Sequence, residues 1–167
     1  ISVDVIGDTV LENNETLTVN LSEWAANRRN LHASPRRRYS DITNNDAASL
    51  SINDASISEG NAGTSQMTFT VTLDQAVDTG LSVNANTADG SATLADSDYV
   101  QVSAAAINFA GNAGETQTIS VDVIGDTVLE NNETLTVNLS GLAANGRNVT
   151  VADSQGQGTI NNDDAAS

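Results

Sequence analysis

Polar and apolar residues alternate with a period of two in several short segments of this chain. Within residues 67–73, Met, Phe, Val and Leu alternate with three threonines, the pattern of a strand that buries one face. The same alternation recurs, in places more weakly, at residues 50–58, 81–86, 104–110, 119–123, 135–139, 147–152 and 156–161. Turn sequences rich in Gly, Asn and Asp separate these segments, and no window has the spacing of an amphipathic helix. The pattern predicts an all-β fold, an immunoglobulin-like antiparallel β-sandwich of about seven strands.

A second, longer regularity is a sequence repeat. Residues 1–22 and 119–140 are the same string, ISVDVIGDTVLENNETLTVNLS, so the chain is part of a tandem array with a period of 118 residues. We interpret residues 50–167 as one complete repeat and residues 1–49 as the C-terminal part of a truncated repeat before it. Because the truncated repeat lacks half of its strands, we expect it to be unstable alone or to pair through open edges with a neighbour.

The strongly negative net charge of the chain restricts the binding partners that it can have. The chain carries 22 acidic residues against 6 basic ones, a net charge of −16, and the complete repeat contains a single basic residue, Arg147. Such a surface repels nucleic acids and anionic membranes and favours cations. There is no cysteine, no visible signal peptide, and no run of about 18 apolar residues that could cross a bilayer. We therefore expect neither nucleic-acid binding nor direct membrane insertion.

The acids of the complete repeat collect at the ends of predicted strands. They are Glu59, Asp96, Asp98, Asp126, Glu130, Glu133, Asp163 and Asp164. Strand ends at one end of a sandwich converge, and carboxylates without nearby Lys or Arg repel one another there, which a hard divalent cation relieves. Calcium, with six to eight oxygen ligands, suits this set better than magnesium, and one histidine without cysteine does not suit zinc or copper. The alternative is that the acids are solvated turn residues.

Four ordered motifs resemble the Calx-beta domain, a family found in sodium–calcium exchangers, an integrin subunit and repetitive bacterial surface proteins. They are SISEG (56–60), TADGSATLADSDY (87–99), GETQTISVDVIGDTVLENNETLTVNL (114–139) and GTINNDD (158–164). The resemblance implies a Ca²⁺ site whose ligands are Glu59, Asp98, Asp126, the Val128 carbonyl, Glu130, Glu133, Asp163 and Asp164. Gly125 and Thr127 stand where the exchanger pattern has further aspartates, which implies fewer ions, about one to three, and millimolar affinity.

The truncated repeat keeps only part of this ligand set. Asp8, Glu12, Glu15 and Asp46 are present, but the equivalents of Glu59 and Asp98 fall outside the chain. We expect this copy to bind calcium poorly or not at all.

Residues 23–46 depart abruptly from the repeat. They align without gaps to residues 141–164, yet only 8 of 24 positions agree. The segment contains five of the six arginines: Arg28, Arg29, Arg36, Arg37 and Arg38. It is a basic patch for a polyanion or an acidic neighbouring repeat, a diverged neutral loop and last strand, or a stretch read in a shifted frame.

Together these observations predict a non-enzymatic, calcium-binding structural repeat of a secreted or cell-surface, adhesin-like bacterial protein. Calcium would rigidify the repeat and its junctions, and the partners would be calcium and neighbouring repeats of the same chain. The alternatives are a regulatory calcium sensor of a membrane transporter and an accessory module of an extracellular enzyme. We expect no catalysis by the chain itself, because it offers no nucleophile–base pair.

Overall fold

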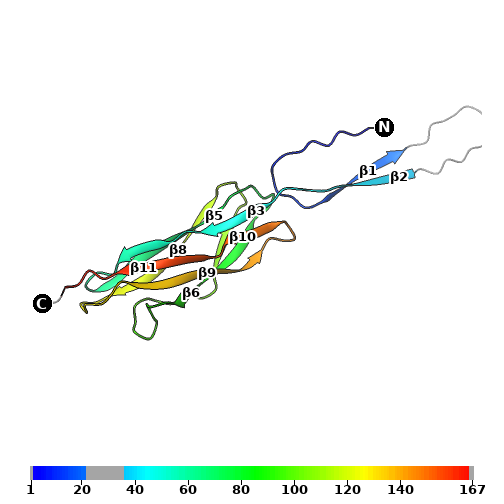
Figure 1. The fold of residues 1–167 in the computed structure, drawn as a ribbon. Coiled ribbons are helices and arrows are strands. Elements are labelled where there is room, and N and C mark those ends of the chain that lie inside the picture. The colour runs from blue at the N-terminus through cyan, green and yellow to red at the C-terminus, as the bar shows by residue number, and fades with distance from the viewer. Residues whose placement is uncertain (1, 22–35, 166–167) are drawn as a thin grey trace, which may run out of the picture.

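The computed structural model describes residues 2–21 and 36–165, which form an elongated molecule of two unequal parts (Figure 1). The larger part is a β-sandwich. The smaller is a two-stranded antiparallel hairpin of β1 (Glu15–Leu21) and β2 (Arg36–Ile42), which extends from the end of the sandwich opposite the C-terminus. The described part of the chain contains no helix long and apolar enough to cross a bilayer.

The sandwich is built from two sheets. Its strands are β3 (Ala48–Ile52), β4 (Ala55–Ser58), β5 (Gly63–Leu73), β6 (Leu81–Asp89), β7 (Ala105–Phe109), β8 (Thr116–Gly125), β9 (Glu133–Ala143), β10 (Val149–Asp153) and β11 (Gln155–Asn161). One sheet has the order β10-β3-β5-β8, and the other has the order β4-β11-β9-β6-β7. The all-β sandwich predicted from the sequence is confirmed.

The first and last strands of the sandwich each cross from one sheet to the other. β3 and β4 are separated by Asn53 and Asp54, and β10 and β11 are separated by Ser154. β3 pairs in parallel with β10, and β4 pairs in parallel with β11, so the two crossings lie side by side. If each split strand is counted once, the described sandwich has the seven strands that the sequence pattern predicts.

The alternating residues supply the core. Met67, Phe69, Val71 and Leu73 of β5 are buried, and β5 pairs with β8 along nearly its whole length, from Gly63↔Gly125 to Thr72↔Thr116. The three aromatic residues of residues 50–167, namely Phe69, Tyr99 and Phe109, are also buried. Burial of each such large side chain contributes roughly 1.5–3 kcal/mol.

The hairpin repeats a pairing found inside the sandwich. Glu15 lies opposite Ile42, just as Glu133 lies opposite Ile160 at positions 118 residues later. The last strand therefore forms in the truncated repeat despite its diverged sequence. Residues 22–35, with Arg28 and Arg29, lie outside the described residues, so the three accounts of the basic segment stay predictions.

Candidate metal centre

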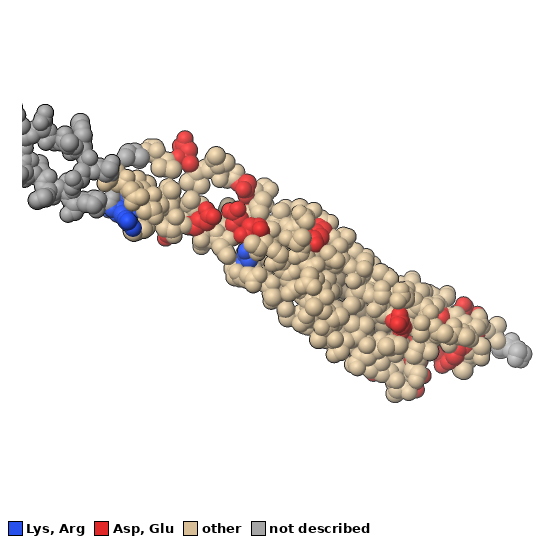
Figure 2. Space-filling model, turned by 180° about the vertical axis from the view of Figure 1, so that it is seen from behind, with Lys and Arg blue, Asp and Glu red and all other residues tan. Residues whose placement is uncertain are grey.

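Four segments meet at the tip of the sandwich beside the C-terminus. They are the turn after β4, the loop between β6 and β7, the loop between β8 and β9, and the residues after β11. Acidic side chains gather at this tip, while the flank between the tip and the hairpin is largely uncharged (Figure 2). The parallel pairing of β4 with β11 explains part of this convergence, because both strands end there with an acidic sequence following.

One group of carboxylates consists of Glu59, Asp163 and Asp164, each with an oxygen atom within 4.8 Å of the others. The Gly60 N–H donates to Asp163 Oδ1 at 3.1 Å, and Asn61 Nδ2 donates to Asp164 Oδ1 at 2.6 Å. Glu59 is only 6% exposed, and Glu59 Oε1 and Asp164 Oδ2 are buried without a hydrogen-bond partner. A buried, unpartnered carboxylate oxygen is costly, and a cation would satisfy it.

A second group consists of Asp98, Glu130 and Glu133, under the same 4.8 Å limit. The backbone N–H of Thr93 donates to Asp98 Oδ2 at 2.6 Å, which fixes that side chain in the loop between β6 and β7. Burial, and then the neighbouring Asp98 carboxylate, raises the pKa of Glu133 to about 7. The sandwich thus holds a carboxyl group at this position that resists ionisation near neutral pH.

Asp126 couples the two groups electrostatically. After burial, its charge is the next cause that raises the pKa of Glu59 and the pKa of Glu130. Mutual repulsion of this kind is what a divalent cation relieves.

The Val128 carbonyl lies in the loop between β8 and β9 and already accepts a hydrogen bond. Asp126 Oδ1 accepts a hydrogen bond from the Val128 N–H at 2.7 Å, and Asn162 Nδ2 donates to the Val128 carbonyl at 3.1 Å. All eight predicted ligand positions therefore lie in the segments that form the tip. Six of them fall into the two close groups, whereas Asp126 and Val128 lie in neither.

Two residues at the tip were not in the predicted ligand set. Asp96 raises the pKa of both Glu130 and Glu133 through its charge, and its carboxylate accepts a hydrogen bond from Thr93 Oγ1 at 2.9 Å. Its place two residues before Asp98 was the available signal. Asn162, which holds the Val128 carbonyl, has no carboxylate and so gave no signal in a search for acids.

Gly125, at the end of β8, stands where the backbone leaves no room for a side chain. A Cβ atom at Gly125 would lie 2.0 Å from the Gly60 carbonyl oxygen and 2.6 Å from the Glu59 carbonyl oxygen. No aspartate fits there unless the turn after β4 moves. Because Gly125 has no side chain, the backbone of the Glu59 turn packs directly against the end of β8.

The donor set fits a hard cation. The single basic residue of the complete repeat, Arg147, forms an ion pair with Asp78 at the opposite end of the sandwich and so does not neutralise the tip. The groups that converge are the carboxylates of the two close groups and the Val128 carbonyl. Oxygen ligands from several loops, with loose geometry, suit calcium better than magnesium or a transition metal.

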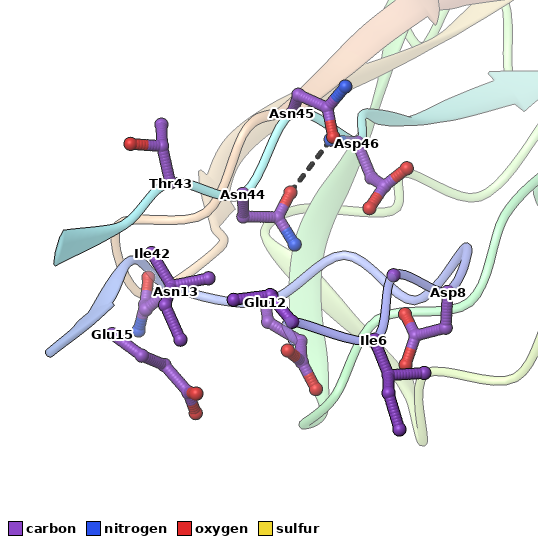
Figure 3. A pocket seen from close by; sticks show the side chains of 12 residues that line it. Ile6, Asp8, Glu12, Asn13, Glu15, Ile42, Thr43, Asn44, Asn45 and Asp46 are labelled. Atoms are coloured by element: carbon purple, nitrogen blue, oxygen red, sulfur yellow. Dashed lines mark hydrogen bonds between the residues drawn. The ribbon is translucent and has the colours of Figure 1, made fainter. Parts of the chain in front are cut away.

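The four acids of the truncated repeat that correspond to predicted ligands lie at its junction with the sandwich. Asp8, Glu12, Glu15 and Asp46 line a cavity of about 290 Å³, where the Asp46 N–H donates a hydrogen bond to Asn44 Oδ1 at 2.7 Å (Figure 3). Among the described residues, these acids form no group of three as close as the two at the tip. Loss of solvent and the Asp8 charge raise the pKa of Glu12.

Solved structures share this fold. The apo form of the Calx CBD1 domain superposes with a TM-score of 0.57 at 21% identity, over 70% of this chain and 98% of that one. The calcium binding domain CBD12 of CALX1.1 gives 0.56 at 21% identity, over 71% of this chain and 47% of that one, so the chain spans about half of it. The Calx CBD2 domain gives 0.53 at 12% identity, over 67% of this chain and 85% of that one.

Sequence comparison gives the family directly. No curated protein sequence matches the chain. The sequence profile of the Calx-beta domain matches residues 1–55 and residues 41–164, which confirms the resemblance seen in the four motifs. The chain belongs to the Calx-beta domain family.

Proposed function

We propose that the tip of the complete repeat binds Ca²⁺ and that the chain is a non-enzymatic, calcium-binding structural repeat. The observation that carries the proposal is the pair of buried oxygens without a partner, Glu59 Oε1 and Asp164 Oδ2, in a group of three carboxylates. The description of CBD12 as a calcium binding domain supports the choice of ion.

Two ion positions correspond to the two carboxylate groups. One ion would be held by Glu59, Asp163 and Asp164, and a second by Asp98, Glu130 and Glu133. The charge of Asp126 acts on a member of each group, so Asp126 would be a ligand of either ion. A bound Ca²⁺ would supply charge neutralisation, so segments that repel one another in the ion-free state would be drawn together. These segments belong to the ends of β4, β8 and β11 and to the loop after β6, so binding would rigidify the tip.

The repeat identity supports a structural role outside the cell. Two copies of a 22-residue string without a mismatch favour a uniform array, and an array with stiffened units suits a secreted or cell-surface, adhesin-like bacterial protein. A regulatory calcium-sensor module is the second candidate, favoured by the structural likeness to CBD12. Affinity separates them, because a sensor operates at roughly 10⁻⁷–10⁻⁵ M calcium and extracellular modules at roughly 10⁻⁴–10⁻³ M.

Calorimetric titration of the whole chain with calcium tests the proposal. The double variant Glu59→Gln/Asp164→Asn should lose the binding heat and the calcium-dependent rise in melting temperature. The matched control Asp4→Asn/Asp46→Asn removes the same charge outside the tip and should keep both. If the unmodified chain gives no heat and no stabilisation at about 10 mM calcium, above the extracellular range, the acids are a solvated surface and the proposal is wrong.

A further inference from the structure

The same leucine occurs twice in the molecule in opposite environments. Leu11 and Leu129 are equivalent positions of the identical string, yet Leu11 is 1% exposed and Leu129 is 57% exposed. Val128, beside Leu129, is also exposed. The sequence around the two leucines is the same, so the difference comes from what lies against each of them.

Leu11 is buried in a socket formed by the loop between β5 and β6 of the complete repeat. Its N–H donates to the Ala76 carbonyl at 2.9 Å, and its own carbonyl accepts from the Asp78 N–H at 3.0 Å. These bonds place it in a parallel bridge with Val77, which is buried. The side chain of Leu11 is thereby part of the hydrophobic core of the sandwich that follows it.

The socket is held in shape by the sandwich itself. The Val77 N–H donates to the Gly111 carbonyl at 2.8 Å, and Gly111 has a φ of 105°, in the region that favours glycine. A Cβ atom at Gly111 would lie 2.4 Å from the Val77 carbonyl oxygen. The ion pair of Asp78 with Arg147 fixes the other side of the loop. Every one of these residues belongs to the complete repeat, so each complete copy would carry the same socket.

We propose that Leu129 is a plug that inserts into the Ala76–Asp78 socket of another copy of this repeat. The copy in the structure shows the fit, because the identical leucine of the truncated repeat already occupies that socket. The residues that follow also match, since Asp164-Ala165-Ala166-Ser167 has the same sequence as Asp46-Ala47-Ala48-Ser49. A socket placed after Ser167 at the same spacing would therefore reach Leu129.

This junction goes beyond calcium binding. Its contacts are the burial of one apolar side chain and two backbone hydrogen bonds, none of which uses a carboxylate of the tip. Burial of a leucine contributes to association independently of ionic conditions, whereas carboxylate contacts depend on the cation. The junction should accordingly form in chelator.

Amide hydrogen exchange tests the proposal on the chain extended by one further copy of residues 50–167 after Ser167, in chelator. In the 167-residue chain, the Leu11 N–H should be protected. The Leu129 N–H should exchange freely, because it makes no backbone hydrogen bond within the described residues. In the extended chain, the Leu129 N–H should slow by about tenfold or more, as expected for an amide held in a locally stable contact.

Two leucine variants of the extended chain complete the experiment. Leu129→Ser should return the Asp78-equivalent amide of the added copy to fast exchange. The control Leu94→Ser, another exposed leucine at the tip, should leave it slow. If the Leu129 N–H exchanges as fast in the extended chain as in the 167-residue chain, the plug does not form and the proposal is overturned. Because no calcium is present, this result is independent of whether the tip binds the ion.

Discussion

Residues 2–21 and residues 120–139 have the same sequence but adopt partly different structures in this molecule. Residues 120–125 are the second half of β8, with Val121 and Val123 fully buried, whereas the identical residues 2–7 form no strand and leave Val3 and Val5 exposed. Further along the same string, residues 133–139 and 15–21 are strands in both places. The difference follows the partners: β8 pairs with β5, while residues 2–7 have no such partner among the described residues. Strand formation here is decided by pairing and burial rather than by local sequence.

The acids follow the same rule. Glu130 and Glu133 join Asp98 in a close group, but their twins Glu12 and Glu15 belong to no such group among the described residues. Glu12 and Glu15 have the same neighbours in sequence as Glu130 and Glu133, but only the second pair lies close to a third acid, Asp98, among the described residues. The close group therefore depends on Asp98 and not on the acidic loop alone.

The largest effect is expected where the two last strands differ most. Gly156 of β11 lies so close to the segment between β3 and β4 that a Cβ atom would be 2.5 Å from the Asn53 carbonyl oxygen. The equivalent residue of β2, 118 positions earlier, is Arg38. Gly156→Arg should lower the free energy of unfolding by about 3 kcal/mol or more, because backbone must move to admit the side chain. Urea unfolding followed by circular dichroism measures this.

The reciprocal change is the control for that variant. Arg38→Gly alters an exposed position that pairs only with β1, so it should leave the unfolding of the sandwich unchanged. Equal effects of the two substitutions would show that β2 is also packed closely against a strand other than β1.

A smaller effect is expected for a matched pair of valines. Val123→Ala removes apolar surface from the core and should cost about 1–3 kcal/mol, from lost burial and the cavity left behind. Val5→Ala changes an exposed residue and should stay within about 0.5 kcal/mol. The same denaturation experiment measures both, and a large effect of Val5→Ala would mean that residues 2–7 have a buried partner in solution.

These comparisons show what the sequence could and could not predict. Alternation found the strands, because a sheet with one buried face needs apolar residues at every second position, as in residues 67–73. It could not distinguish residues 2–7 from residues 120–125, since the two are identical. It also could not locate the crossing at Asn53 and Asp54, because the split of the first strand depends on which sheet its partner joins.

The site was predictable in part for a related reason. Acids at strand ends indicate convergence, and the positions carried by the family motifs all lie at the tip. Asp89 stands directly before Gly90, a sequence typical of a simple turn, yet it accepts a hydrogen bond from the buried Tyr99 hydroxyl at 2.6 Å. That contact joins the end of β6 to the loop that follows it, and it leaves no spacing signal in the sequence.

A matched pair of glutamates sharpens the comparison of the two acidic loops. Glu133→Gln removes a carboxylate from a close group and should weaken calcium binding about tenfold or more, about 1.4 kcal/mol. Glu15→Gln removes the same charge from the same local sequence and should leave the affinity unchanged. Calorimetry on both variants measures this, and equal weakening would place a calcium site in the truncated repeat as well.

The smallest expected effect is a dependence of the stability of the calcium-free chain on pH. The folded-state pKa of Glu133 is raised from 4.5 to about 7, so folding favours its protonated form. The stabilising contribution of that proton is fully present below pH 4.5 and is lost as the pH rises through about 7. In chelator, the melting temperature should therefore be higher at pH 5 than at pH 8, and Glu133→Gln should reduce this difference while Glu15→Gln should not. Calcium should bind more weakly at pH 6 than at pH 8, since the ion must displace the same proton. A pH profile that is identical for the two glutamine variants would mean that Glu133 does not carry this dependence of stability on pH.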